Sequence, residues 1–129
     1  MKVLLLLTAL AVLPAATFAG SLPETLQRVK PGVVAVGTYM ALRRDQDRLL
    51  GTGFVVAGGN HVVTNSHVVP RRLDRGRRET AAIYLPAEGS RIRRREAEVA
   101  KRDIVHDLCL LRFDGPALRS LTLGASEEV

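Results

Sequence analysis

The sequence of 129 residues contains one cysteine, three phenylalanines, two tyrosines and no tryptophan. Because a single cysteine cannot form a disulfide within the chain, the fold must be held by its hydrophobic core. No aromatic side chains are interleaved with its basic residues, which argues against a binder of single-stranded nucleic acid. The absence of an internal repeat excludes solenoids and arrays. What remains is one small globular domain.

The N-terminus has the features of a signal peptide. Lys2 supplies a positive charge, residues 3–13 form an uncharged apolar stretch, and small residues precede a cleavage point after Ala19. We therefore predict a signal peptide at residues 1–19 and an exported domain at residues 20–129, either periplasmic or secreted. A retained membrane anchor is the alternative, but the apolar stretch is shorter than the roughly twenty residues of a membrane span. We expect no stable membrane insertion after cleavage.

Positive charge is concentrated in one part of the chain. The formal net charge is +6, and residues 71–102 hold eleven Arg or Lys against five Asp or Glu, which accounts for the whole excess. A solvated loop is one interpretation of this segment, and a surface for an acidic partner is another. Export argues against nucleic acid as a partner.

Short aliphatic runs alternate with polar turns after the signal segment. Residues 21–29 carry apolar side chains at helical spacing and predict a short helix that ends at Pro31 and Gly32. Six further runs predict strands: Val33–Met40, Leu49–Ala57, His61–Thr64, Thr80–Leu85, Arg91–Val99 and Leu108–Phe113. This pattern predicts an all-β fold. We favour a six-stranded antiparallel barrel over a sandwich, because a closed barrel leaves no strand edge exposed.

Two residues, His67 and Asp107, are candidates for acid–base catalysis. His67 follows a polar turn at the end of a predicted hairpin, where a solvent-facing cleft can form. Asp107 directly precedes an apolar run, and a carboxylate beside a core strand is costly unless it has a partner. A histidine that takes a proton from a nucleophile needs a buried carboxylate to orient it. We therefore predict His67 as a general base and Asp107 as its orienting acid. A structural histidine and a turn aspartate are the alternatives.

The sequence resembles the first two catalytic blocks of chymotrypsin-fold serine proteases of the bacterial HtrA/Deg type. The similar segments are residues 51–54 (Gly-Thr-Gly-Phe), 64–69 (Thr-Asn-Ser-His-Val-Val) and 107–111 (Asp-Leu-Cys-Leu-Leu). Residues 31–36 resemble the strand that opens that domain, and residues 121–126 resemble the stretch after its aspartate strand. The segments follow the order of the family and span nearly all of the exported part.

The resemblance implies the N-terminal half of a chymotrypsin-like double barrel in a serine endopeptidase, which hydrolyses polypeptides through an acyl-enzyme. His67 would be its general base and Asp107 its orienting acid. The nucleophilic serine would come from a Gly-rich turn in a second barrel, and no such turn follows Asp107 in this sequence. We therefore interpret the chain as a fragment and expect it to be inactive by this mechanism. No cofactor is expected.

Other side chains are weaker candidates. Ser66 adjoins His67, but adjacent residues point in different directions, so we do not predict it as the nucleophile. Cys109 lies in a run destined for the core and is predicted to be buried and unreactive. Turn or cap roles are predicted for Asp103, Asp114 and Ser126. No metal site is predicted, because zinc-ligand spacing is absent from the set His61, His67, His106 and Cys109.

Two other functions remain open from the sequence. An inactive protease-like chain would be a binding module whose Arg-rich loops, Arg71–Arg78 and Arg91–Arg95, hold an acidic partner. A peripheral envelope protein would bring the same arginines to anionic lipid. A Gly-x-Ser-Gly turn in the reading frame, roughly 70 to 110 residues beyond Asp107, would favour the protease.

Overall fold

The computed structural model describes residues 22–86, 89 and 91–125. The predicted signal peptide at residues 1–19, and Ser126, lie outside these residues. Within the described part of the chain, no helix combines the length and the apolar character that crossing a membrane requires.

One helix, α1 (Leu22–Val29), leads into six strands. The strands are β1 (Val33–Met40), β2 (Asp47–Val56), β3 (His61–Asn65), β4 (Glu79–Pro86), β5 (Ile92–Asp103) and β6 (Leu108–Phe113). Short 3₁₀ turns lie at Lys30–Gly32, Ala57–Gly59 and Arg75–Arg77. All six predicted strands are present. The largest difference is at the end of β5, which continues to Asp103 rather than stopping at Val99.

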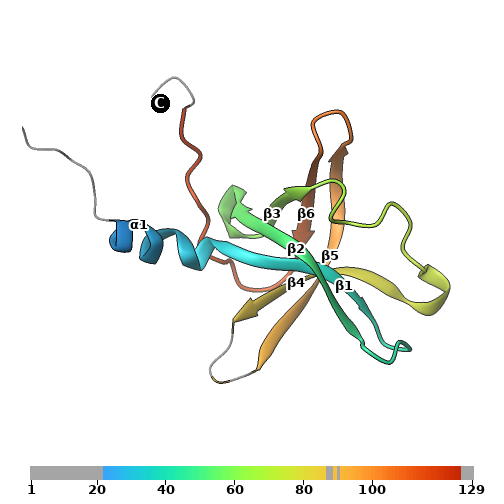
Figure 1. Cartoon of the computed structure of the whole chain (residues 1–129). Coiled ribbons are helices and arrows are strands. Elements are labelled where there is room, and N and C mark those ends of the chain that lie inside the picture. Colours follow the sequence, from blue (N-terminus) through green and yellow to red (C-terminus); the bar gives the residue numbers. More distant parts are fainter. Residues whose placement is uncertain (1–21, 87–88, 90, 126–129) are drawn as a thin grey trace, which may run out of the picture.

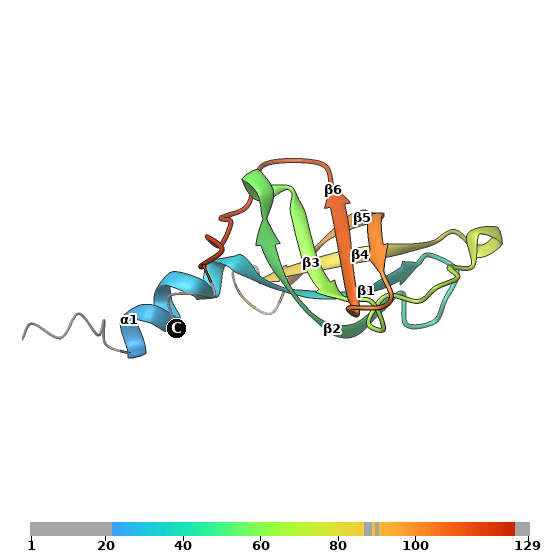
Figure 2. The ribbon, with the colours of Figure 1, turned by 90° about the horizontal axis from the view of Figure 1, so that it is seen from above.

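The six strands form a closed barrel in the order β1-β2-β3-β6-β5-β4, and every neighbouring pair is antiparallel. The predicted all-β barrel is therefore confirmed. Figures 1 and 2 show α1 projecting from one end of the barrel, and no residue of this helix is buried. In both views the Arg75–Arg77 turn projects on the opposite side.

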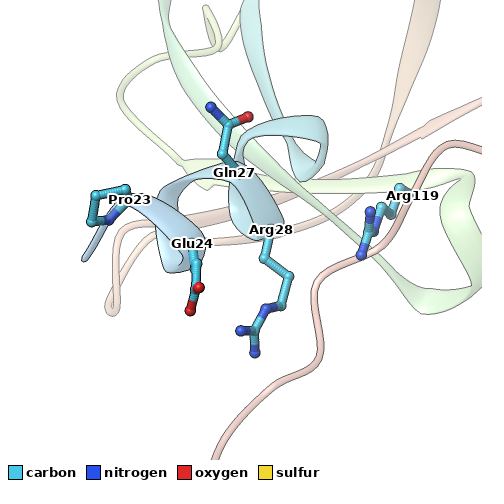
Figure 3. A pocket seen from close by; sticks show the side chains of 5 residues that line it. All are labelled: Pro23, Glu24, Gln27, Arg28 and Arg119. Atoms are coloured by element: carbon cyan, nitrogen blue, oxygen red, sulfur yellow. The ribbon is translucent and has the colours of Figure 1, made fainter. Parts of the chain in front are cut away.

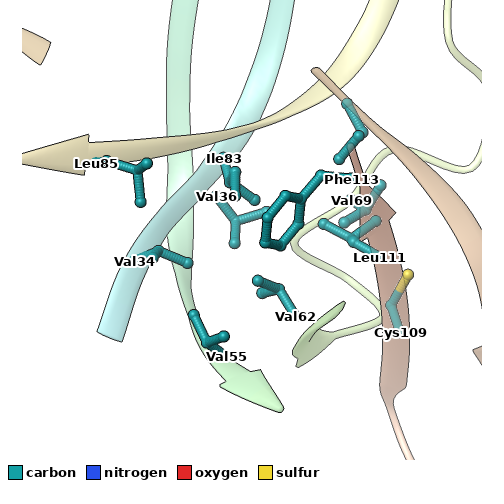
Figure 4. Close-up of a cluster of buried hydrophobic side chains, with 12 residues drawn as sticks. Val34, Val36, Val55, Val62, Val69, Ile83, Leu85, Cys109, Leu111 and Phe113 are labelled. Atoms are coloured by element: carbon teal, nitrogen blue, oxygen red, sulfur yellow. The ribbon is translucent and has the colours of Figure 1, made fainter. Parts of the chain in front are cut away.

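The barrel interior is filled by apolar side chains from all six strands. Alternation along β1 turns Val34 and Val36 inward, and Leu111 and Phe113 face them from β6. Figure 4 shows these side chains converging on one apolar cluster. Because the chain has no internal disulfide, burial of this cluster is the main source of stability for the scaffold that carries the site.

The two glycines of the Gly-Thr-Gly segment in β2 provide space for packing. A Cβ atom on Gly53 would lie 2.5 Å from Val62 Cγ1, inside the barrel. A Cβ atom on Gly51 would lie 2.9 Å from Val68 Cγ2. The lack of a side chain at Gly51 therefore lets Val68, the residue after His67, pack directly on β2.

Candidate active site

Pairing between β3 and β6 brings together two segments that are far apart in the sequence. Asn65, the last residue of β3, is the partner of Leu108, the first residue of β6. His67 lies two residues beyond Asn65, and Asp107 lies one residue before Leu108. Both residues are therefore at the same rim of the barrel, on the loops that follow and precede paired strands.

Two hydrogen bonds join His67 directly to the carboxylate of Asp107. The ring Nδ1 of His67 lies 2.6 Å from Oδ2, and the backbone N–H of His67 donates to Oδ1 over 2.9 Å. The backbone N–H of Ser66 and the side-chain amide of Asn65 both donate to the carbonyl oxygen of Asp107, over 3.0 and 3.1 Å. Backbone and side chain of Asp107 are thus both fixed against the segment that carries His67.

The turn that carries Asp107 has an unusual backbone and is open to solvent. Asp107 has a φ of 54°, in the left-handed region that aspartate tolerates better than most residues. Its side chain is 44% exposed, and that of His67 is 72% exposed. Within this chain the carboxylate is therefore only partly covered, because Asp107 lies in the turn between β5 and β6 and not inside the barrel.

The environment of Asp107 favours its ionised form. The backbone N–H of His67 is the main cause, and the ring of His67 the second, of a carboxyl pKa below the ordinary value of 3.8. An ionised carboxylate only accepts hydrogen bonds, so Nδ1 of His67 must carry the proton. Nε2 of the neutral ring is then left with a free lone pair, which is what a general base requires.

We expect a lowered pKa for the Asp107 carboxyl group to be measurable by carbon NMR titration. A carboxylate with a lowered folded-state pKa stabilises the fold fully above its unfolded pKa, and that contribution is lost as the pH falls through the folded value. The pair should therefore be intact near neutral pH and break only below about pH 4. In His67→Ala the Asp107 pKa should rise part of the way, since the backbone donor remains. Titration of Asp107 at or above 3.8 in the wild-type chain would contradict this account.

Arg102, near the end of β5, holds the segment that carries His67. Its Nη1 donates to the carbonyl oxygens of Ser66 and Val69 over 2.6 and 2.9 Å and contacts Ser66 Oγ at 3.2 Å. Its Nη2 donates to the carbonyl oxygen of Pro70 over 3.3 Å. Val69 itself is buried in the barrel core. One guanidinium group and one core side chain therefore fix the segment on both sides of His67.

Sequence reasoning missed Arg102, which it counted only as part of a basic segment. The contacts join residues 32 to 36 positions apart and have no local sequence signature. The sequence prediction ended this strand at Val99 and so left Arg102 in a turn, whereas in the structure β5 continues past Arg102. An arginine there stands beside the loop that follows β3, whose carbonyl groups lack strand partners.

A second histidine–aspartate pair lies in the same turn. His106 Nδ1 lies 2.7 Å from Asp103 Oδ2, and the backbone N–H of His106 donates to Asp103 Oδ1 over 3.0 Å. Asp103 is the last residue of β5 and not a turn residue, because β5 extends beyond its predicted end, and its partnership with His106 in the following turn was not foreseen. This pair joins the end of β5 to the turn that follows it, whereas the pair of His67 and Asp107 joins the loop after β3 to the turn before β6. It serves as a natural control for the other pair.

The remaining sequence candidates take no part in the pair of His67 and Asp107. Ser66 lines the same pocket, but it is buried and its hydroxyl faces Arg102. Cys109 is buried as predicted, and burial raises the pKa of its thiol. Among the described residues, no group of three or more His, Cys, Asp or Glu side chains is arranged to hold a metal ion.

Two hollows in the surface have different chemistry. A pocket of about 380 Å³ is lined by His67 and Asp107 together with Arg71 and Ile104. A shallower hollow of about 470 Å³ lies against α1 and Arg119, as Figure 3 shows, and contains neither residue of the pair. The first pocket is the candidate site, because it alone of the two combines an oriented imidazole with a carboxylate.

Comparison with known proteins gives a family and two similar structures. Residues 51–129 match the trypsin-like peptidase domain. The chain is similar to the crystal structure of Deg5, with a TM-score of 0.60 and 26% identity over 83% of this chain and 49% of that one. It is also similar to the protease domain of MamO from Magnetospirillum magneticum in its apo form, with a TM-score of 0.50 and 26% identity over 70% and 42% of the two chains. The chain thus spans about half the length of these structures. No curated protein matches it.

Proposed function

Because the chain belongs to the trypsin-like peptidase domain family, we propose that it supplies the general base and the orienting acid of a serine endopeptidase. His67 is the base and Asp107 the acid. The observation that carries this proposal is the 2.6 Å contact between His67 Nδ1 and Asp107 Oδ2, made across forty residues of sequence. The substrate class is polypeptide, and residues 20–129 form the barrel domain of an exported protein, periplasmic or secreted.

In the proposed reaction, His67 Nε2 takes the proton of a serine hydroxyl as the serine oxygen attacks the carbonyl carbon of the scissile peptide bond. Asp107 stabilises the resulting imidazolium through Nδ1–H. His67 then gives the proton to the leaving amine as the C–N bond breaks, and an acyl-enzyme remains. Water, activated by the same imidazole, hydrolyses the ester and restores the serine.

The serine and the donors that stabilise the oxyanion are assigned to a second barrel that faces the His67 pocket. Ser66 does not replace this serine, because the Ser66 side chain is buried and its hydroxyl accepts a hydrogen bond from Arg102. We therefore expect the 129-residue chain by itself to be inactive by this mechanism.

A fluorophosphonate probe, which labels activated serines, tests the assignment. The protein to use carries this barrel together with the serine-bearing second barrel. The probe should label its serine, and the 129-residue chain alone should stay unlabelled. Absence of both labelling and casein cleavage in a protein whose second barrel holds the serine would refute the proposal.

The second candidate, an inactive module that holds an acidic partner with both Arg-rich segments, has weaker support. Arg91–Arg95 lies largely in β5. Arg94 donates to Asp47 over 2.8 Å and stacks over the ring of Tyr39, while Arg95 donates to the carbonyl oxygen of Pro116. These two guanidinium groups have structural partners. Arg71–Arg78 has no such partners among the described residues and keeps the features of a free basic surface.

A further inference from the structure

The segment Arg71–Arg78, called the arginine loop below, directly follows the residues that carry His67. Its five arginines, Arg71, Arg72, Arg75, Arg77 and Arg78, are all exposed. Among the described residues, none of their side chains donates a hydrogen bond or forms an ion pair. The loop therefore presents several guanidinium groups to solvent.

The acids closest to the loop in sequence are already engaged. Asp74 accepts from the backbone N–H of Arg77 over 3.1 Å. Glu79 accepts from Arg43 over 3.2 Å and from the backbone N–H of Asp74 over 3.0 Å. Neither carboxylate forms an ion pair with an arginine of the loop among the described residues, and five arginines against Asp74 leave the loop with a net positive charge.

Arg71 connects this charge to the candidate active site. It lines the same pocket of about 380 Å³ as His67 and Asp107. Asp107 is hydrogen-bonded to His67 through both carboxylate oxygens and forms no ion pair with Arg71 among the described residues. Arg71 is thus the arginine of the loop that a group bound beside His67 would meet first.

The position of Arg71 relative to His67 is fixed by the scaffold. Arg102 holds the carbonyl oxygens of Val69 and Pro70, and the side chain of Val69 is buried in the core. The backbone is therefore anchored up to the residue before Arg71. A cation placed by an anchored backbone can favour one register of a bound chain.

We propose that the His67 pocket and the arginine loop together select polypeptide segments rich in acidic side chains, with Arg71 contacting a carboxylate of the segment beside the scissile bond. The inference rests on the proposed function. Guanidinium groups pair with carboxylates through two parallel hydrogen bonds, which gives orientation as well as attraction. Each exposed pair contributes little, so the preference arises from several arginines and decreases with salt. A peptide fits better than a membrane, because a flat bilayer cannot enter a concave pocket.

The chain offers a matched control for Arg71. Arg93 is also exposed, and it pairs in register with Leu85 at the far end of β4. The arginine loop enters β4 at Glu79, six residues of strand away, which is about 20 Å. Substitution of Arg71 or Arg93 by glutamine removes one charge from the same molecule, but only Arg71 lines the His67 pocket.

The test is an NMR titration of the 129-residue chain with two blocked peptides, one with three consecutive glutamates and one with three glutamines in their place. We expect the glutamate peptide to bind roughly tenfold more tightly at low salt. Its shifts should centre on the backbone amides of His67 and Arg71. Arg71→Gln should weaken it about threefold, and Arg93→Gln should leave it nearly unchanged.

Three results would overturn the inference. The first is equal affinity for the two peptides. The second is an equal loss of affinity for the glutamate peptide in Arg71→Gln and Arg93→Gln. The third is displacement of the glutamate peptide from the amides of His67 and Arg71 by anionic lipid vesicles. Amide spectra of both variants show whether the fold is kept. The experiment measures peptide binding, so its outcome does not depend on turnover. Equal affinities for the two peptides would refute this inference and leave the catalytic assignment of His67 intact. Unchanged turnover in His67→Ala would refute that assignment and leave the measured peptide preference intact.

Discussion

His67→Ala is expected to lower kcat/KM for peptide hydrolysis by on the order of 10⁴-fold or more in a protein that joins this barrel to a serine-bearing second barrel. Without the imidazole, nothing takes the proton from the serine hydroxyl or returns one to the leaving amine. The side chain of His67 is largely exposed, so its loss should leave the fold and its thermal transition nearly unchanged. Steady-state kinetics on a peptide substrate give the measurement.

His106→Ala is the matched control for this experiment. His106 has the same two hydrogen bonds to an aspartate, and its side chain is exposed to the same extent as that of His67. Its replacement should change kcat/KM by less than about twofold, because surface substitutions away from a site have small effects. Unchanged turnover in His67→Ala, or an equal loss in the two variants, would refute the assignment of the base.

Arg102→Ala is expected to lower kcat about 10²-fold in the same protein, because a displacement of about 1 Å in a catalytic group can cost that much. The substitution removes the donor to the carbonyl oxygens of Ser66, Val69 and Pro70. Partly buried carbonyl groups left without a donor should also cost about 2–4 kcal/mol of stability. Arg102 is a positioning residue, since it acts through the segment that carries His67.

A titration separates this positioning role from a general loss of stability. In Arg102→Ala the pKa of the Asp107 carboxyl should return toward 3.8, because the donors of His67 move away. The pKa of Asp103 should stay lowered, because its donors lie in its own turn. Arg102→Lys should restore part of the activity. Arg112→Ala, which removes an exposed arginine from β6, should change neither value. If Arg102→Ala returned the pKa of the Asp107 carboxyl to 3.8 and still kept its full kcat, the account would be contradicted.

The architecture could be predicted because its signals are local. Strands such as Val33–Met40 and Leu108–Phe113 are mainly apolar runs bounded by turns, and their predicted bounds agree with β1 and β6 residue for residue. The closed barrel followed from the need to leave no strand edge exposed. The resemblance to trypsin-like proteases of the Deg type is confirmed by the family match and by the similarity to Deg5.

The details of the site could be predicted only in part. The order of the blocks was enough to propose His67 and Asp107 as partners, and the structure brings their side chains into contact. Their catalytic roles remain a prediction. The exposure of Asp107 was not foreseen, because its left-handed turn depends on tertiary contacts with Asn65 and Ser66. The contacts of Arg102 were missed for the same reason.

The partnership of His67 and Asp107 is the claim on which the account depends, and the protonation of the His67 ring tests it most directly. Long-range proton–nitrogen NMR correlations of the 129-residue chain near neutral pH show which ring nitrogen carries the proton. The account predicts a proton on Nδ1 and a free lone pair on Nε2, and it predicts that Asp107→Asn reverses this preference. A wild-type ring with its proton on Nε2, or with the same tautomer mixture in both proteins, would contradict it.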